Sequence, residues 1–473
     1  MKYKGILILL MLVLVGGTWL FSQKDPDILK FKDIDFKPIN PGYEKIREGL
    51  NFYFVQDDEV PAVNVYILIK TGRLDDPKEK VGLASLTVNL MKSGGTKDMT
   101  PEEVEEKIDF LGARTYAYAG DEYSWFGLWT LKKNFSDSWK LLTDMIINPR
   151  FDQKRLELEK MKELENIRRR WDRPISVGFT LFSELVYGKE FAEVRRTTSK
   201  GIESISAADI ENFYKNYIKD RELIIAFSGD FDKQEVVNLV SKTFTGWQGI
   251  PTVKRDIPAV KLATAPGIYL INKEDMTQAV VCVGHLGINR LDPDNVEINV
   301  LNFIYGSGSF NSRIMREIRS NRGLAYAAFG SVRTGRDKGA FFNFSMTKNE
   351  SVGEVITIMR EIINDITQKP VTPEELELAK KSEKNSFVHR FDSSTSVLLR
   401  KLINKLQGYP DDYLETYIER IEKVNADKVL EMASRTIHPD QLITLVVGKK
   451  EAIMDQLKSL TTGKVIELEL PKE

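Results

Sequence analysis

The sequence has very few of the residues that hold metals through sulfur or imidazole. Its 473 residues include one cysteine, Cys282, and three histidines, His285, His389 and His438. A single cysteine excludes an intrachain disulfide framework and a cysteine-based zinc cluster. No two histidines lie within helical pairing distance of each other in the sequence. We therefore expect no zinc site built from this chain alone.

A surplus of charge is also absent. The chain has 68 Lys and Arg residues against 69 Asp and Glu residues, which gives a formal net charge of −1 at pH 7. Without a basic excess there is no electrostatic drive toward phosphates, so nucleic acid is not an expected partner. The hydrophobic content of 42% and the length are typical of a folded protein with two or more domains.

The first residues resemble an export signal rather than part of the fold. Lys2 and Lys4 precede an apolar run from Gly5 to Phe21. The run is near the upper length of a cleaved signal and near the lower length of a spanning helix, so both interpretations remain open. We expect residues 1–22 to be a signal peptide or membrane anchor, followed by an exposed linker at residues 23–35. The expected location is the periplasm or cell envelope.

The remainder of the chain contains an internal repeat. Two segments, IESISAADIENFYKNYIKDRELIIAFSGD and IEKVNADKVLEMASRTIHPDQLITLVVGK, begin at Ile202 and Ile421, an offset of 219 (421 − 202). A second match links the segments that begin at Pro61 and Gln278, at an offset of 217 (278 − 61). Two matches at nearly one offset indicate a duplication.

Two homologous domains are therefore expected, at residues 36–250 and 267–473, joined by a proline-containing linker at 251–266. In each, strands of period two alternate with amphipathic helices, some of which open with Thr-Pro-Glu-Glu, at Thr100 and Thr372. The pattern predicts the α+β class, with a mixed β-sheet covered by helices in each half.

A resemblance to a known family begins at Arg47, in REGLNFYFVQDDEVPAVNVYILIKTGRLDDPKEKVGLASLTVNLMKSGGT. This segment resembles the opening of the pitrilysin/insulinase family of zinc peptidases, which includes mitochondrial processing peptidase and the core proteins of the bc1 complex. The likeness continues through NPRFD at Asn148 and SFNSRIMREIRSNRGLAY at Ser309. It implies two halves arranged as a clamshell around a polypeptide chamber.

The zinc motif of that family is degenerate here. Active members carry H-x-x-E-H, in which two histidines bind zinc and the glutamate activates water. Aligned on the family pattern, the histidine positions are Ser85 and Asn89, the glutamate position is Val88, and the downstream glutamate ligand falls on Asn166. Serine and asparagine are not ligands that zinc prefers, and valine cannot accept a proton.

A shift of alignment does not repair the motif. Glu163 and Glu165 are close to Asn166, but no shift restores the two histidines. The resemblance therefore implies no metal and no cofactor in this chain, and a protein that is inactive alone.

The second half keeps another element of the family, an arginine and a tyrosine seven residues apart. In REIRSNRGLAY these are Arg319 and Tyr326, and Arg322 is the nearest alternative. In the family the tyrosine stabilises the tetrahedral oxyanion and the arginine holds a substrate carbonyl. From composition alone, the same residues are an ordinary solvated basic face beside a strand tyrosine.

One further segment, YSWFGLWTLKK at Tyr123, alternates aromatic and small residues as a half-buried strand does. In the family a strand in this region forms a sheet edge, along which an extended substrate adds itself.

The resemblance as a whole implies a non-catalytic subunit of a pitrilysin-like peptidase. Arg319 and Tyr326 would act in trans, next to the zinc of a homologous partner chain, on peptide or unfolded polypeptide substrates. The alternative is a peptide-binding or scaffold protein of the cell envelope with no proteolytic role. The membrane would be contacted only through the N-terminal segment.

Overall fold

The structure is a computed structural model that describes residues 38–471 except 253, 254, 256 and 392. Residues 38–473 make one compact unit. The expected leader at residues 1–22 and linker at 23–35 lie outside the described part of the chain. Within that part, no helix is both long enough and apolar enough to cross a bilayer.

The first half is built on a six-stranded sheet in the order β1-β2-β6-β3-β5-β4. Its strands are β1 (Gly42–Arg47), β2 (Leu50–Gln56), β3 (Ala62–Ile69), β4 (Arg114–Ala119), β5 (Ser124–Leu131) and β6 (Leu223–Gly229). Apolar residues of four of these strands, including Phe52, Val65 and Phe227, enter one large core together with the helices of this half. Burial of this apolar area is the main force that holds the half together.

One helix of this half, α3, starts where the sequence predicts. The Thr100 hydroxyl accepts a hydrogen bond from the backbone N–H of Glu103, and the Glu103 carboxylate accepts one from the backbone N–H of Thr100. These two bonds form a capping box at the start of α3. The helices are α2 (Leu83–Ser93), α3 (Pro101–Phe110), α4 (Phe135–Ile147), α5 (Gln153–Arg168), α6 (Pro174–Tyr187), α7 (Ser199–Ser204), α8 (Ala207–Phe213) and α9 (Lys233–Thr243).

The second half contains the second six-stranded sheet, in the order β10-β12-β8-β13-β7-β14. Its strands are β7 (Gly267–Asn272), β8 (Gln278–Leu286), β10 (Ala325–Val332), β12 (Ala340–Lys348), β13 (Ile443–Gly448) and β14 (Ile466–Leu468), and a separate parallel pair is formed by β9 (Ile288–Asn289) and β11 (Thr334–Gly335). The helices are α10 (Ile298–Asn302), α11 (Arg313–Met315), α12 (Val352–Gln368), α13 (Pro373–His389), α14 (Ser394–Leu406), α15 (Tyr417–Lys423), α16 (Ala426–Thr436) and α17 (Lys450–Ser459).

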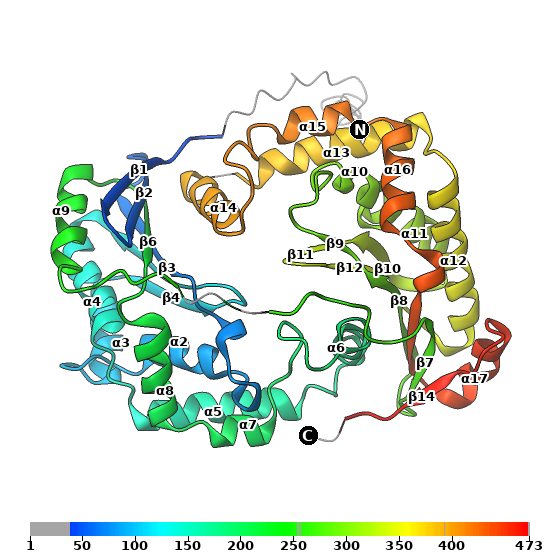
Figure 1. Cartoon of the computed structure of the whole chain (residues 1–473), viewed down its shortest axis with the longest axis horizontal. Coiled ribbons are helices and arrows are strands. Elements are labelled where there is room, and N and C mark those ends of the chain that lie inside the picture. The colour runs from blue at the N-terminus through cyan, green and yellow to red at the C-terminus, as the bar shows by residue number, and fades with distance from the viewer. Residues whose placement is uncertain (1–37, 253–254, 256, 392, 472–473) are drawn as a thin grey trace, which may run out of the picture. The chain divides into compact units, whose positions relative to one another are not determined.

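The strand pairing of the two sheets follows the duplication seen in the sequence (Figure 1). In the first half, β2 and β6 are parallel, and β6, β3, β5 and β4 then pair antiparallel. In the second, β7 and β13 are parallel, and β13, β8, β12 and β10 pair antiparallel. The two sheets differ only at one edge, where β1 is antiparallel to β2 but β14 is parallel to β7. The predicted α+β class with two homologous halves is confirmed.

The expected linker at residues 251–266 has no helix or strand among its described residues. It is nevertheless held to both halves. The Arg255 guanidinium donates to Asp75 of the first half at 2.6 and 2.8 Å, and the Val260 amide donates to Asp337 of the second half at 2.6 Å.

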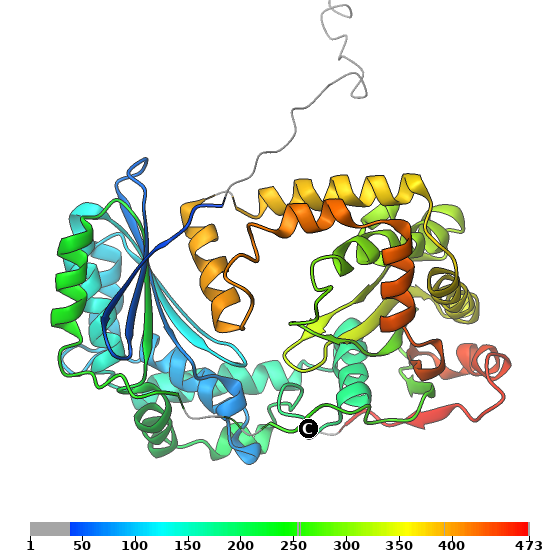
Figure 2. The ribbon, with the colours of Figure 1, turned by 45° about the horizontal axis from the view of Figure 1, so that its top comes forward.

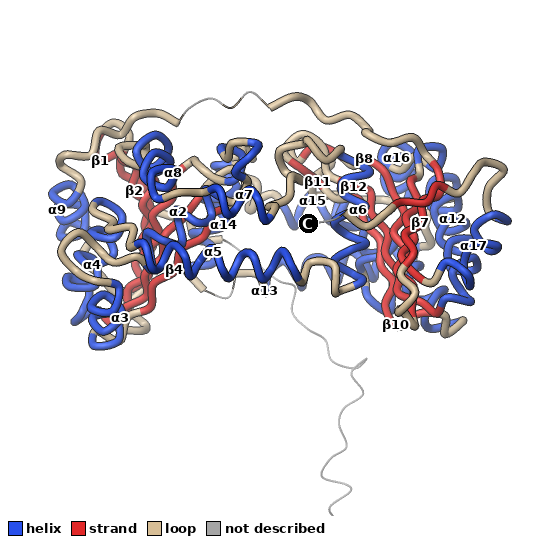
Figure 3. The backbone as a smooth tube through the Cα atoms, turned by 90° about the horizontal axis from the view of Figure 1, so that it is seen from below, coloured by secondary structure: helices blue, strands red, loops and turns tan. Residues whose placement is uncertain are grey.

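One face of the second sheet is covered by a helix that precedes the linker. Figure 3 shows α12 and α17 on one side of this sheet and α6 on the other. Leu181 and Phe182 of α6 pack in a cluster with residues of β7, β8, β12 and β13. The approach is close, because a Cβ atom at Gly178 would lie 2.6 Å from Val280 Cγ1. A glycine is therefore required at this contact.

The reverse arrangement occurs at the first sheet, where α14 of the second half covers the face opposite α4 and α9 (Figures 2 and 3). Leu398 and Leu402 are buried against Val55, Leu68 and Ala226 of the sheet. Polar contacts join the same surfaces: Ser394 Oγ donates to Asp57 at 2.9 Å, and Ser228 Oγ lies 2.6 Å from Thr395 Oγ1. Each half thus depends on a helix from the other for a closed core.

The sheet edges correct one expectation from the sequence. The aromatic strand β5 is not an edge, because it pairs with β3 on one side and with β4 on the other. The edge strand next to β5 is β4, and its exposed face carries Tyr116 and Tyr118. In the second sheet the corresponding edge is β10.

His285 on β8 generates a prediction about pH. It is fully buried; its Nε2 accepts the backbone N–H of His438 at 2.8 Å, and its Nδ1 lies 2.6 Å from the Leu286 carbonyl oxygen. Burial lowers the pKa of His285 from 6.5 to about 4. The neutral form therefore stabilises the fold above pH 6.5, and this stability is lost as the pH falls toward 4. The expected loss is about 3 kcal/mol.

Urea denaturation measured between pH 7 and pH 4 tests this. The His285→Asn variant, which cannot titrate, is expected to show a flatter pH dependence. His389→Asn, at the exposed end of α13, is the control and should follow the wild type. The same pH dependence of stability in all three proteins would contradict the lowered pKa of His285.

Candidate functional site

The helix α2, which carries the degenerate motif, is fixed at its start by a buried carboxylate. Asp76 accepts hydrogen bonds from the backbone N–H groups of Gly82 at 2.8 Å and Ala84 at 2.7 Å. Burial raises the pKa of Asp76 to about 7. Gly82 has a φ of +104°, a conformation that L side chains rarely adopt, so this turn into the helix requires glycine.

Three of the four motif positions face one cavity of about 460 Å³. It is lined by Ser85 and Asn89 of α2, by Asn166 of α5, and by the segment at residues 195–197. The i, i+4 spacing places the two α2 residues on one face of the helix, as the sequence indicates. The structure therefore brings Ser85, Asn89 and Asn166 together.

Val88 is placed differently from the other three. Its side chain is 0% exposed and belongs to the core of the first half, and it does not line the cavity. The family's catalytic glutamate position is therefore used here for packing.

The cavity does not fit a divalent metal ion. Its charged lining residues are the cations Arg73, Lys162, Arg170, Arg195 and Arg196 and the anions Glu159 and Glu163. Glu159 is paired with Lys162 at 2.6 Å, while Glu163 accepts from Thr197 Oγ1 at 2.9 Å and from Asn166 Nδ2 at 3.2 Å. The cationic surplus opposes Zn²⁺ electrostatically. Among the described residues, no group of three or more His, Cys, Asp or Glu side chains is arranged to hold a metal.

Sequence reasoning missed the hydrogen-bond network among the residues that line this cavity. Arg170 donates to Thr197 Oγ1 at 2.7 Å and to the Thr197 carbonyl at 2.9 Å. The only signal in the sequence is the pair of basic runs, RRRW at residue 168 and RR at residue 195, and their proximity in space depends on the fold.

The second candidate pair lies at the start of the edge strand β10. The strand register shifts between Ala325 and Ala327, so Tyr326 is the extra residue of a β-bulge. Its side chain is 71% exposed. The Arg319 guanidinium lies 4.8 Å from the centre of the Tyr326 ring, at cation–π distance. The structure therefore brings Arg319 and Tyr326 together.

The local backbone explains how Arg319 reaches the ring. The short α11 continues as a π-helical turn from Arg316 to Asn321, and Gly323, with a φ of +64°, ends it before β10 begins. Wide turns of this kind are frequent at functional sites. On its other side Arg319 lies 4.8 Å from the ring of Phe310, a contact that sequence reasoning missed.

Arg322 has a different environment. Its Nη1 lies 3.3 Å from Glu354 Oε1, in an exposed ion pair. Neither Arg319 nor Tyr326 lines the cavity around Ser85 and Asn89. The degenerate motif and the arginine–tyrosine pair are thus two separate sites on this chain.

Family comparisons match both halves. A family model described as "Insulinase (Peptidase family M16)" matches residues 53–192, and one described as "Peptidase M16 inactive domain" matches residues 204–383. An uncharacterised zinc protease of Bacillus subtilis is 22% identical over 401 residues, covering 85% of this chain and 96% of the relative. A probable mitochondrial-processing peptidase subunit beta of Arabidopsis thaliana is 21% identical over 84% of this chain and 76% of its own length.

Solved structures show the same fold. A peptidase M16 inactive domain from Pseudomonas fluorescens superposes with a TM-score of 0.78 at 19% identity, covering 87% of this chain and 98% of that one. A protease from Helicobacter pylori gives a TM-score of 0.74 at 18% identity, covering 87% of this chain and all of that one (100%).

The geometry of the cavity predicts how metal binding could be restored. The triple variant Ser85→His, Asn89→His, Asn166→Glu is expected to bind zinc, because all three positions face one cavity, whereas the wild-type chain should bind none. Adding Val88→Glu should destabilise the fold by several kcal/mol, because it places a carboxylate in the core. Metal analysis of the purified proteins and thermal melts measure both effects.

The matched control replaces the same three residues by alanine and should bind no zinc. One tightly held zinc per wild-type chain, or a triple variant that folds and binds no metal, would contradict the interpretation of positions 85, 89 and 166 as degenerate zinc-ligand positions.

Proposed function

Because the chain belongs to the insulinase family of peptidases, M16, we propose that it is a non-catalytic subunit. In this proposal it contributes Arg319 and Tyr326 to the active site of a homologous, zinc-bearing partner chain. The substrates are peptides or unfolded polypeptides.

The observation that supports this most strongly is the contrast between the two sites. The positions of the metal ligands are occupied by Ser85, Asn89 and Asn166, beside a surplus of cations. Tyr326, by comparison, is exposed on an edge strand, and Arg319 of the preceding turn lies at cation–π distance from its ring. A scaffold with no proteolytic role has no need of a β-bulge that presents Tyr326 beside Arg319.

The chemistry of the pair suits a transition state that develops negative charge. The Tyr326 hydroxyl makes no hydrogen bond to any described residue, so it is free to donate to an oxyanion. The cation of Arg319 lies over the ring, where it holds the ring in place and presents N–H donors to a substrate carbonyl. Neither residue needs a metal held by this chain.

The setting of the complex is also part of the proposal. The charged and apolar pattern of residues 1–22 supports export to the periplasm or cell envelope, with the segment either cleaved or kept as an anchor. The compact unit formed by residues 38–473 would then work outside the cytoplasm.

Substitution of Tyr326 tests the role of the hydroxyl. In the complex with the zinc-bearing partner, Tyr326→Phe is expected to lower kcat by about 10²–10³, because one oxyanion donor is lost. Assembly and peptide affinity should change little, since the aromatic ring and its contact with Arg319 are kept. Steady-state kinetics and analytical ultracentrifugation measure the two properties.

Arg319→Ala and Arg322→Ala form a matched pair for the cation. Arg319→Ala is expected to affect both KM and kcat, because it removes a donor to the substrate and the contact that holds Tyr326. Arg322→Ala removes only an exposed ion pair with Glu354 and should have little effect. Equal losses for the two variants, or wild-type turnover in Tyr326→Phe, would favour the scaffold alternative.

A further inference from the structure

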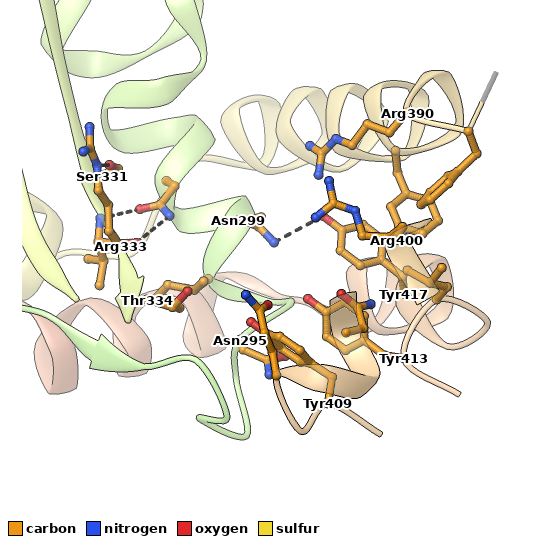
Figure 4. A pocket seen from close by; sticks show the side chains of 18 residues that line it. Asn295, Asn299, Ser331, Arg333, Thr334, Arg390, Arg400, Tyr409, Tyr413 and Tyr417 are labelled. Carbon is orange, nitrogen blue, oxygen red and sulfur yellow. Dashed lines mark hydrogen bonds between the residues drawn. The ribbon is translucent and has the colours of Figure 1, made fainter. Parts of the chain in front are cut away.

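A second cavity, of about 390 Å³, lies in the C-terminal half, away from both sites described above. Its wall comes from four segments: the α10 region, the end of β10 with β11, the end of α13 with α14, and the loop and helix at residues 407–417. Figure 4 shows the labelled polar side chains that line it. The volume is within the range of pockets that take small ligands.

Three arginines line this cavity, and no aspartate or glutamate is among its described lining residues. Arg333, Arg390 and Arg400 are all exposed. Arg333 lies over the ring of Phe342 at 4.9 Å, and Arg390 is 3.7 Å from Glu383, a buried carboxylate behind the wall. Arg400 has no ion-pair or hydrogen-bond partner among the described residues. The arginine charges are thus only partly balanced.

The arginines enter the cavity from different elements. Arg390 follows the last residue of α13, whereas Arg400 lies within α14. In Figure 4 both side chains extend into the same space. Two guanidinium groups that face one cavity repel each other, and an anion between them removes this repulsion while accepting their N–H groups.

An unpaired amide on α14 also lines the cavity. Asn404 is one helical turn beyond Arg400, so the two share a face of the helix. Its side chain is 7% exposed, and its Nδ2 has no hydrogen-bond partner. A buried N–H donor without an acceptor is costly, and a ligand oxygen would satisfy it.

Part of the remaining wall is aromatic, beside asparagine, serine and threonine side chains from the α10 region and the end of β10. Tyr409, Tyr413 and Tyr417 recur at every fourth position and line the same side. Burial raises the pKa of Tyr413 to about 12, so its hydroxyl stays protonated and able to donate at neutral pH. By contrast, Asn299 donates to the Tyr417 hydroxyl at 3.2 Å, so that group is already used within the wall. Aromatic rings provide an apolar surface for the part of a ligand that carries no charge.

From these contacts we propose that the cavity binds an anionic ligand through a carboxylate or phosphate group. The oxyanion lies between Arg390 and Arg400 and accepts from Asn404, and an apolar or aromatic part of the ligand packs against the tyrosines. The chemistry fits two sources, the free C-terminal carboxylate of a peptide and a phosphate of a small metabolite. The proposal does not rest on a role in proteolysis.

The proposed ligand lies close to the contact between the halves. The helix that presents Arg400 and Asn404 to the cavity is α14, which buries Leu398 and Leu402 against the first sheet. A ligand held by both Arg390 and Arg400 ties this helix to the end of α13. The cavity thus lies beside the interface on which the first half depends.

Titration calorimetry on the full chain at low salt tests the proposal with four probes. These are a short peptide that ends in a free phenylalanine carboxylate, the same peptide with an amidated C-terminus, inorganic phosphate, and ATP. Binding of the free-acid peptide but not of the amide identifies a peptide carboxylate. Binding of phosphate and ATP identifies the phosphate group of a small metabolite as the ligand. Each result supports an oxyanion site.

Variants locate the bound anion. Arg400→Gln and Arg390→Gln are each expected to weaken binding by about tenfold or more, because a charge-assisted hydrogen bond is lost. The control Arg322→Gln changes an exposed arginine of the same half and should bind as the wild type does. Thermal melts without ligand check that the variants fold. No binding of any probe at millimolar concentration, or equal weakening by the control, overturns the proposal.

Discussion

Each six-stranded β-sheet of this protein has two apolar faces, and the helices of its own half cover only one. The second face is closed by a helix carried by the other half, α6 on the second sheet and α14 on the first. The hydrophobic cost of leaving such a face in water ties the halves together more strongly than any single polar contact. The cavity around Ser85 and Asn89 is lined in part by Thr180 of α6, and the arginine-lined cavity by Arg400 and Asn404 of α14.

The packing of α2 explains how the fold stays intact with serine and asparagine at positions 85 and 89. The helix α2 is held by Asp76 at its start and by Val88 and other buried residues along its core face. Ser85 and Asn89 face a cavity instead, so the identity of these side chains contributes little to stability. Substitution of the ligands therefore removes the chemistry and leaves the structure. The Arg319–Tyr326 contact lies on a different element and is unaffected by that loss.

Much of the fold could be predicted from the sequence, because the signals were local or repeated. The caps at Thr100 and Thr372 start helices where expected, and the repeat offset anticipates the shared strand pairing. The choice of sheet for α6 and α14 could not be predicted, since an amphipathic pattern specifies a buried face but not its partner. The contact of Phe310 with Arg319 and the meeting of Arg390 with Arg400 likewise depend on tertiary packing.

The central claim is that this chain works beside the zinc of another chain. It is tested most directly by purifying the tagged, full-length protein from its native cells under mild conditions, then determining chain stoichiometry by native mass spectrometry and metal content by elemental analysis. The expected result is a complex with a homologous chain that carries H-x-x-E-H, with one zinc for each such chain. A protein that purifies only with copies of itself and without zinc, or one that holds zinc on its own chain, would contradict it.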